Sequence, residues 1–280
     1  MTSRSGITLI FVLWLAVLGW SLIYPSQMDA QTEGNDAVYN ASNAVTFSPS
    51  FIDASQFLNP LTQGRDLCDT IFGIFTNKWG VASYPAAGAV IDARGISGTS
   101  NLKCTHGTPW TEGSTTVTAP SIILLPATGG ATPNPIIIPN SSPWILPSNT
   151  HLIGEGDGIP TYSSGTLIST PGTTIQAASG FSGTMIQFGS SSPVCPSTGC
   201  SGISVENLTL DGQGPLGQTV NGIANSYSQD GSYVDHVSLF QILGTGLAVS
   251  GTASNSGPYS NLTFDTGGDS RHVVNYMRQH

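Results

Sequence analysis

Short apolar runs separated by turn-forming residues dominate the chain from position 81 onward. Each run is only a few residues long and is flanked by glycine, proline, asparagine or serine, as expected for strands rather than helices. The clearest runs are Ala89–Ile91, Ile122–Leu125, Ile136–Ile138, Trp144–Leu146, Leu167–Ile168, Met185–Phe188 and Leu247–Val249. The pattern therefore predicts an all-β protein built from many short strands.

A single amphipathic helix is predicted ahead of the strands, from Gln63 to Lys78. Its apolar stripe recurs at helical spacing and comprises Leu67, Ile71, Ile74 and Phe75, with Lys78 at its end. Residues 31 to about 60 are polar, small and aperiodic, and are interpreted as a linker or arm. Residues 31–80 are thus predicted to hold a linker and a helix, and residues 81–266 the strands.

An internal repeat indicates how the strands are arranged. Three seven-residue segments align without gaps, beginning at Val205, Val234 and Tyr259, with offsets of 29 and 25 residues. A period of about 20–30 residues with several short strands per repeat is typical of a solenoid. The third positions of the segments would form one column at a bend: Asn207, His236 and Asn261. Asparagine suits such a column because it tolerates left-handed backbone geometry.

The composition agrees with a turn-rich β protein and excludes other classes. Charged residues make up 8% of the chain and apolar residues 39%, with 34 glycines and 18 prolines among 280 residues. Helical bundles need charged surfaces, and disordered acidic chains lack this apolar content, so neither class fits. The net charge of −9 and the scattered Lys and Arg residues argue against a phosphate-binding surface, so no nucleic-acid partner is expected.

The amino terminus has the pattern of an export signal. Arg4 is followed by an uncharged run from Ile7 to Tyr24, and a basic residue before an apolar run is typical of such signals. The run also reaches membrane-spanning length. Residues 1–30 are therefore either a cleaved signal peptide or an uncleaved membrane anchor through residues 7–24. In both cases the remaining chain is expected to be exported, to the medium or to the cell envelope.

The cysteines support an exported protein. Their number is even, and all four lie outside the leader: Cys68, Cys104, Cys195 and Cys200. Proximity in the sequence favours the pairs Cys68–Cys104 and Cys195–Cys200, the second of which would close a tight loop. A zinc site is the alternative, but there is no Cys-x-x-Cys pair and no histidine beside the cysteines.

Several segments resemble coils of the pectate-lyase superfamily. They are Gly88–Gly95 with the following Leu102–Cys104, then Ile145–Gly156, and then Ile203–Gly214. The resemblance covers residues 81 to 265 and implies a right-handed parallel β-helix. It also implies that the helix at 63–78 caps the amino-terminal end and that a Cys68–Cys104 disulfide ties this cap to the first coil. The resemblance is specific for the fold and much less so for the chemistry.

Enzymes with that fold are polysaccharide lyases or glycoside hydrolases. No Lys or Arg occurs from Leu146 to Gly268, which argues against a lyase base in this span, and the motifs of galacturonase-like hydrolases have no counterpart. A glycosidase needs two carboxylates. Asp211 and Asp265 occupy one column of the repeat, two coils or roughly 10 Å apart, just above the ~6.5–9.5 Å of inverting enzymes. A turn role is the alternative for both aspartates.

Asp235 and His236 form a second constellation, which could relay protons or bind a cation. A structural role is the alternative, because His236 stands in the asparagine column. Glu206 is adjacent to Asp235 in the repeat register, and the two could form an acidic stripe for Ca²⁺, although the sequence requires no cofactor. His106 and His151 have no ligand partner at a suitable spacing.

Two aromatic residues are candidates for stacking on sugar rings. Phe240 lies between the two aspartates of the column, and Trp144 lies in an earlier coil. For Trp144, packing in the core or at a turn is the alternative.

Two functions follow from these observations. The first is an exported polysaccharide-interacting protein, a pectate-lyase-like lyase or hydrolase, with candidate catalytic residues Asp211, Asp235 and Asp265 and candidate substrate-binding residues Phe240 and Trp144. The second is a non-catalytic binding or structural β-helix at the cell surface. Residues 267–280 depart from the repeat and are expected to be an irregular tail, as in a shortened member of the family that lacks its catalytic coil.

Overall fold

The computed structural model describes residues 50–58, 66–78, 83–129, 132–139, 143–250, 255–265 and 275–276. All of them belong to one unit of the chain, Phe47–His280. The predicted leader, most of the predicted linker and nearly all of the predicted tail lie outside these residues. Within the described part of the chain, no helix is long and apolar enough to cross a membrane.

Parallel strand pairing organises the structure into three ladders. The first contains β1 (Ser50–Asp53), β2 (Ala89–Asp92), β6 (Ser121–Leu124), β9 (Thr150–Ile153) and the first halves of β14 (Ser204–Asp211), β16 (Tyr233–Phe240) and β18 (Tyr259–Asp265). The second contains β7 (Ile136–Ile138), β12 (Thr174–Ala177) and the second halves of β14, β16 and β18. The third contains β8 (Trp144–Leu146), β13 (Gly183–Phe188), β15 (Val220–Asn225), β17 (Leu247–Val249) and β19 (Asn275–Tyr276).

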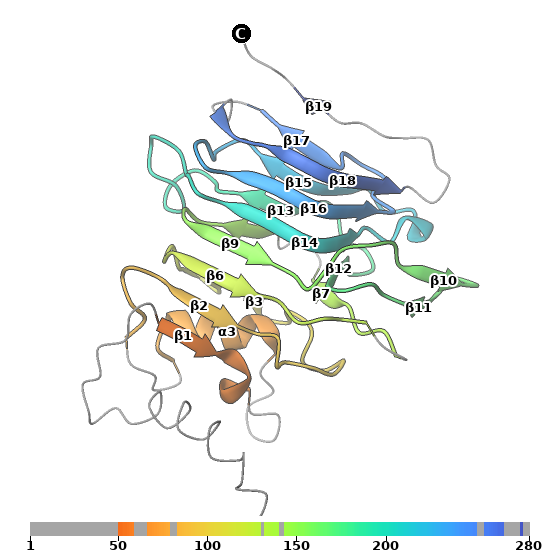
Figure 1. Cartoon of the computed structure of the whole chain (residues 1–280), viewed down its shortest axis with the longest axis horizontal. Helices are drawn as coiled ribbons and strands as arrows, with labels where there is room; N and C mark the ends of the chain where they lie inside the picture. Colours follow the sequence, from red (N-terminus) through yellow and green to blue (C-terminus); the bar gives the residue numbers. More distant parts are fainter. Residues whose placement is uncertain are drawn as a thin grey trace, which may run out of the picture. The chain divides into compact units, whose positions relative to one another are not determined.

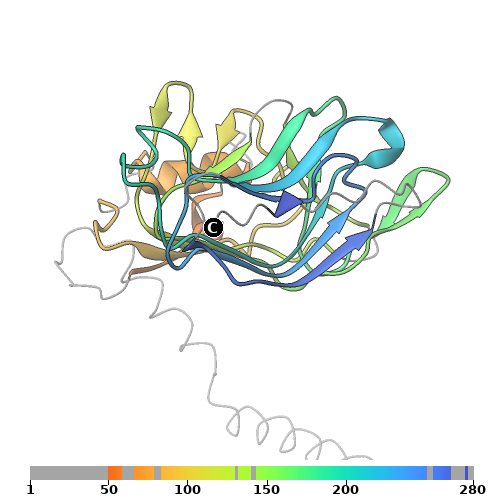
Figure 2. The ribbon, with the colours of Figure 1, turned by 90° about the horizontal axis from the view of Figure 1, so that it is seen from above.

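From β6 onward the chain visits the three ladders in a fixed order, so that each return adds one strand to every ladder. Figure 1 shows the strands of the first ladder lying side by side from β1 to β18. Figure 2 shows the third ladder facing the other two. The prediction of an all-β protein of short strands is confirmed, and nearly every predicted run coincides with a strand.

The register confirms the repeat found in the sequence. Val205 pairs with Val234, and Val234 pairs with Tyr259, with the offsets of 29 and 25 residues that the gapless alignment gave. The column at the bend is also confirmed, because Asn207, His236 and Asn261 have φ values of 53°, 50° and 52°. These left-handed residues mark the corner at which β14, β16 and β18 pass from the first ladder to the second.

Side chains that alternate between buried and half-buried positions along the short strands form the core. In β7 and β8 the outer residues are buried and the middle one is half-buried, as a strand with one face toward the interior requires. Trp144 of β8 is fully buried and packs edge-to-face on Trp110, with ring centroids 6.1 Å apart. Aliphatic side chains of every ladder join one continuous core, including Ile91, Ile138, Leu152, Ile186, Val205 and Leu210.

The predicted helix is α3 (Leu67–Phe75), the one α-helix among the described residues. Its whole predicted stripe is buried. Asp66 caps its first turn, with Oδ1 accepting a hydrogen bond from the Asp69 N–H at 3.0 Å. Lys78, just past its end, forms an ion pair with Glu112 at 2.9 Å.

The linker expectation does not hold for Ser50–Asp53, which forms β1 and pairs with β2. Ile52 of β1 is buried, whereas its neighbour Phe51 is exposed. The 3-10 helix η1 (Ala54–Phe57) follows, and Phe57 is also buried in the core. The two apolar residues of this segment are adjacent and show no alternation with polar ones, so the sequence does not distinguish the strand from a polar arm.

Antiparallel elements interrupt the ladders, and the sequence did not predict them. β10 (Thr161–Ser163) and β11 (Thr166–Ser169) form a hairpin between β9 and β12. The predicted run Leu167–Ile168 lies in this hairpin. A second antiparallel set contains β3 (Gly107–Thr108), β4 (Thr111–Glu112) and β5 (Thr115–Thr116).

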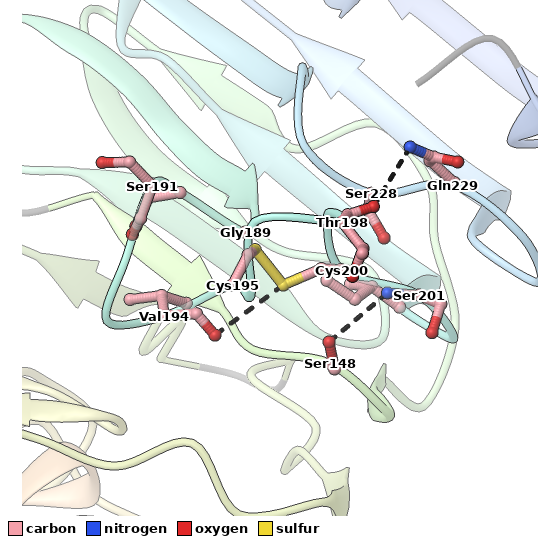
Figure 3. The surroundings of a disulfide bond; sticks show 12 residues. Ser148, Gly189, Ser191, Val194, Cys195, Thr198, Cys200, Ser201, Ser228 and Gln229 are labelled. Carbon is pink, nitrogen blue, oxygen red and sulfur yellow. Dashed lines mark hydrogen bonds between the residues drawn. A yellow bond between two sulfur atoms is a disulfide. The ribbon is translucent and has the colours of Figure 1, made fainter. Parts of the chain in front are cut away.

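The cysteines form the two predicted disulfides, Cys68–Cys104 and Cys195–Cys200, which removes the zinc alternative. The first joins α3 to the segment that follows β2. The second closes a six-residue loop after β13, and Figure 3 shows Gly189 beside it. A Cβ atom at Gly189 would collide with the sulfur of Cys195, so glycine is required there. Paired cysteines indicate an oxidising environment of the extracellular type.

Candidate functional site

One row of the second ladder collects most of the predicted site residues. The strand register places Gln176 of β12, Asp211 of β14, Phe240 of β16 and Asp265 of β18 on neighbouring rungs. Asp211 and Asp265 are therefore two rungs apart, as the repeat predicted. Adjacent rungs are about 4.8 Å apart. The row lies at the carboxyl ends of β14, β16 and β18, where loops leave the sheet.

Asp211 is fully buried and accepts three hydrogen bonds. Its Oδ1 accepts from the Gln213 N–H at 2.9 Å, which fixes the turn that leaves β14. Its Oδ2 accepts from the Gln176 Nε2 at 2.8 Å and from the Tyr162 hydroxyl. The turn role predicted as an alternative is therefore present, and the same carboxylate also holds a tyrosine from another element.

Burial decides the protonation chemistry of this group. Loss of solvent raises the pKa of Asp211 above its ordinary value, although the hydrogen bonds from Tyr162 and Gln176 oppose the change. Burial and the neighbouring Asp211 carboxylate raise the pKa of Tyr162 far above that of a free tyrosine. Tyr162 therefore remains a proton donor to Asp211 and does not act as a base at neutral pH.

Tyr162 reaches the row from the β10–β11 hairpin. Its ring stacks on Phe240 with centroids 6.0 Å apart and planes inclined by 14°. Phe240 is 6% exposed, so Tyr162 covers the ring that the sequence suggested as a sugar platform. The hairpin turns through Ser164 and Gly165, which both have positive φ. In the sequence, this Ser-Gly pair between two threonine-containing segments is the local signal for the hairpin.

A cavity of about 160 Å³ lies beside the Tyr162–Asp211 contact. The residues that line it come from the hairpin, from β12 and from the loops that follow β14 and β16: Tyr162, Gly165, Leu167, Gln176, Gln213, Leu216 and Gln241. The loop after β14 contains the 3-10 helix η2 (Gly214–Leu216). It approaches Gln241 closely because Gly212 and Gly214 have no Cβ; at Gly212 a Cβ would lie 2.7 Å from the Gln241 carbonyl oxygen.

Gln241 is the one lining residue with an unsatisfied buried group. Gln241 is buried, with 7% relative exposure, and its Oε1 accepts no hydrogen bond from any described residue. Buried polar atoms in native proteins normally have a partner. Gln176 and Tyr162 of the cavity wall are engaged with each other, because Gln176 donates to the Tyr162 oxygen at 2.9 Å as well as to Asp211.

Asp235 lies away from this row, in the first ladder. Its Oδ1 accepts from Ser260 Oγ and Asn261 Nδ2, both at 2.8 Å, and its Oδ2 contacts His236 Nδ1 at 2.9 Å. These hydrogen bonds lower the pKa of Asp235 to about 2. Asp235 is therefore ionised at neutral pH, and its oxygens are occupied by neighbours on the same strand and the next one. It does not meet Asp211 or Asp265 in a common site.

The predicted acidic stripe of Glu206 and Asp235 exists as a register pair. Glu206 Oε1, however, accepts hydrogen bonds from Ser204 Oγ at 2.6 Å and Tyr233 Oη at 2.8 Å. Both carboxylates are thus used by protein donors rather than directed at a shared position, and calcium binding there stays a prediction.

Asp66, Asp69 and His106 form a group whose potential ligand atoms lie within 4.8 Å of one another. His106 Nδ1 contacts Asp69 Oδ2 at 2.8 Å, which corrects the expectation that His106 has no ligand partner at a suitable spacing. The hydrogen bond that His106 donates to the Asp69 carboxylate raises the pKa of His106. Asp66 Oδ2 accepts from the N–H and hydroxyl of Thr105, both at 2.6 Å, in addition to its helix cap. Asp66 therefore ties α3 to the segment at Cys104.

Trp144 is also outside the candidate site. Its side chain is fully buried against Trp110, so its ring is not accessible for stacking on a sugar. Core packing, the alternative considered for this residue, is what the structure shows.

Known proteins offer no further guide to this site. Comparisons with protein-family models, with curated proteins and with solved structures found no match to the chain. The resemblance to the pectate-lyase superfamily therefore rests on the residues and the repeat alone.

Proposed function

We propose that this chain is an exported right-handed parallel β-helix, similar to the pectate-lyase superfamily, that binds polysaccharide. The ordered visits to three parallel ladders support the β-helix. Parallel crossover connections are almost always right-handed, which supports the handedness. The apolar run of residues 7–24 and the two disulfides support export.

One observation carries the binding function: a cavity at the ends of neighbouring strands is lined by glutamine side chains together with aliphatic and aromatic ones and by no charged residue. Binding sites typically combine apolar walls with a few placed polar groups. Sugars match this combination because their rings present apolar faces and hydroxyl edges to the protein. The geometry thus favours binding over bond cleavage.

Hydrolysis is a second candidate, favoured by the raised pKa of Asp211, which is the property a general acid needs. The only other carboxylate of the row is Asp265, two rungs away at roughly 10 Å. That separation lies just beyond the range of about 6.5–9.5 Å that places a water molecule for inversion. Asp211 also directs its Oδ2 at Tyr162 and Gln176. These contacts are typical of a structural carboxylate.

Incubating the purified exported protein with a panel of polysaccharides separates the possibilities. Retention on one or more glycans without product is the expected result. New reducing ends, abolished by Asp211→Asn, would establish the hydrolase, and unsaturated products would establish a lyase. If the protein neither bound nor cleaved any glycan of the panel, the proposed function would be refuted.

A further inference from the structure

We propose that the cavity beside Asp211 accepts a single ring of a neutral, hydroxyl-rich glycan and discriminates against acidic sugars. This inference rests on the proposed polysaccharide-binding function and specifies the ligand class and its position. It uses the cavity lined by Tyr162, Leu167, Gln176, Leu216 and Gln241.

The size of the cavity sets the size of the ligand group. Its volume of about 160 Å³ is close to that of engineered cavities of roughly 150 Å³ that bind one benzene ring. A hexose is larger than benzene, so the cavity can receive no more than one sugar residue, and the rest of a chain has to lie outside it.

The polar part of the wall favours a ligand with hydroxyl groups. It consists of amide and phenol side chains and contains no charged group: Tyr162, Gln176, Gln213 and Gln241. A glutamine amide both donates and accepts hydrogen bonds, and a hydroxyl group can do the same in return. A purely apolar ligand would leave the amide groups that it desolvates without partners, which is unfavourable.

The remaining wall is apolar and partly open. Leu167 belongs to the hairpin and Leu216 to η2, so the two leucines approach the cavity from separate elements. Leu216 is 56% exposed, an unusual state for a large aliphatic residue at a cavity edge. Contact with the apolar face of a sugar ring would remove this surface from water.

The charges around the cavity disfavour an acidic sugar. The lining contains no cation, and the chain has no Lys or Arg from Leu146 to Gly268. The nearest cation along the row is Lys103, which bridges to Ile137. Ile137 pairs with Gln176, so Lys103 is two rungs, or roughly 10 Å, beyond Gln176. An acidic ligand would place its carboxylate near Asp211 without a counter-ion, which is costly in a buried site.

The test measures affinities of the full-length exported protein by calorimetry. The probes are neutral oligosaccharides of glucose, mannose and xylose on one side and oligogalacturonate on the other. We expect at least one neutral probe to bind at least tenfold more tightly than oligogalacturonate. Gln241→Met keeps the volume but removes the acceptor, and it should weaken that binding about tenfold.

Two further variants keep the test interpretable. Gln229→Met is the matched control, because Gln229 lies near the Cys195–Cys200 loop, where its Nε2 donates to the Thr198 carbonyl at 3.4 Å (Figure 3). It should bind as the unchanged protein does. Leu216→Trp alters an exposed residue and should obstruct the cavity without affecting folding. Gln241→Met should also unfold at the same temperature as the unchanged protein or higher, because it removes an unsatisfied buried atom.

The outcomes separate this inference from the function on which it rests. Preferred binding of oligogalacturonate would overturn the neutral-sugar inference and leave the polysaccharide function standing. Neutral binding that Gln241→Met and Leu216→Trp leave unchanged would overturn the position of the site. An absence of binding to every probe would overturn both.

Discussion

Asp211 and Asp235 are aspartates on adjacent strands, and each forms three hydrogen bonds. Their surroundings nevertheless shift their pKa values in opposite directions. Asp211 is buried, and loss of solvent raises its pKa despite its hydrogen bonds. Asp235 is at the surface, and hydrogen bonds from Ser260, Asn261 and His236 lower its pKa to about 2. The difference shows that burial, rather than the number of hydrogen bonds, decides in which direction the pKa of each carboxylate moves.

The left-handed corner separates these two environments. Asp235 precedes His236 on the first ladder, and Asp211 follows Asn207 at the end of the second. The β10–β11 hairpin covers only the second position, by placing Tyr162 on Phe240 and Asp211. A cavity and an unpaired Gln241 occur on that side of the corner.

The largest effect should come from removing the buried carboxylate. Asp211→Ala leaves the Tyr162 hydroxyl, the Gln176 amide and the Gln213 N–H without their acceptor. We expect a loss of about 2–4 kcal/mol in the free energy of unfolding, measured by urea denaturation. Asp235→Ala is the matched surface control and should have a much smaller effect. Equal losses in the two variants would break the comparison.

Disrupting the left-handed corner should reduce the free energy of unfolding somewhat less. Asn207→Val forces a β-branched side chain into a backbone with φ of 53°, which should destabilise the protein by about 1–2 kcal/mol. Asn207→Gly suits the same backbone and should be tolerated far better. Thermal unfolding of both variants measures the difference. If valine and glycine behaved alike at this position, the corner would not depend on the left-handed conformation.

The pH dependence of stability should show the burial of Asp211. Its folded pKa is above the ordinary 3.8, so above pH 3.8 the native state binds more protons than the unfolded state until the folded pKa is passed. The free energy of unfolding therefore falls as pH rises through that window. Asp211→Asn should lack this decline. A curve for the unchanged protein that rose relative to the variant in this window would show that hydrogen bonding outweighs burial.

Asp235 should have the smallest effect on the pH dependence of stability, and this effect should be opposite in sign to that of Asp211. Its folded pKa of about 2 is below the ordinary 3.8, so between these values the unfolded state binds more protons. The stability that Asp235 provides is present above pH 3.8 and is lost as pH falls through about 2. In thermal unfolding from pH 5 to pH 2, the unchanged protein should be more stable than Asp235→Asn above about pH 4, and the difference should shrink as pH falls toward 2. A difference that persisted unchanged to the lowest pH would contradict the assignment.

Local patterns predicted much of the fold because successive strands of a ladder repeat the same short-range rules. The gapless alignment of residues around Val205, Val234 and Tyr259 is the register of the strands, since parallel pairing places equivalent residues on adjacent rungs. The corner residues were predictable for the same reason. The four-residue strand β1 was not predicted because Phe51 and Ile52 are adjacent apolar residues that show no alternation with polar ones.

The site was less predictable because its contacts join distant parts of the chain. Asp211 and Phe240 were found through the repeat, but Tyr162 lies 49 residues before Asp211 in a hairpin outside the repeat. Gln241 has no distinctive neighbours in the sequence, and only its burial without a donor shows its importance. The burial of Trp144 depends on which face of β8 turns inward, and a three-residue strand does not reveal that.

The most direct test of the account is to observe the cavity residues while a glycan binds. With glutamine and tyrosine side chains labelled for NMR, a neutral oligosaccharide that binds should shift the resonances of Tyr162, Gln176 and Gln241. The resonances of Gln229 and Tyr233, which lie away from the cavity, should stay unchanged. Shifts at Tyr233, next to the Glu206–Asp235 pair, with none at Gln241 would place the ligand on the other side of the corner and contradict the account.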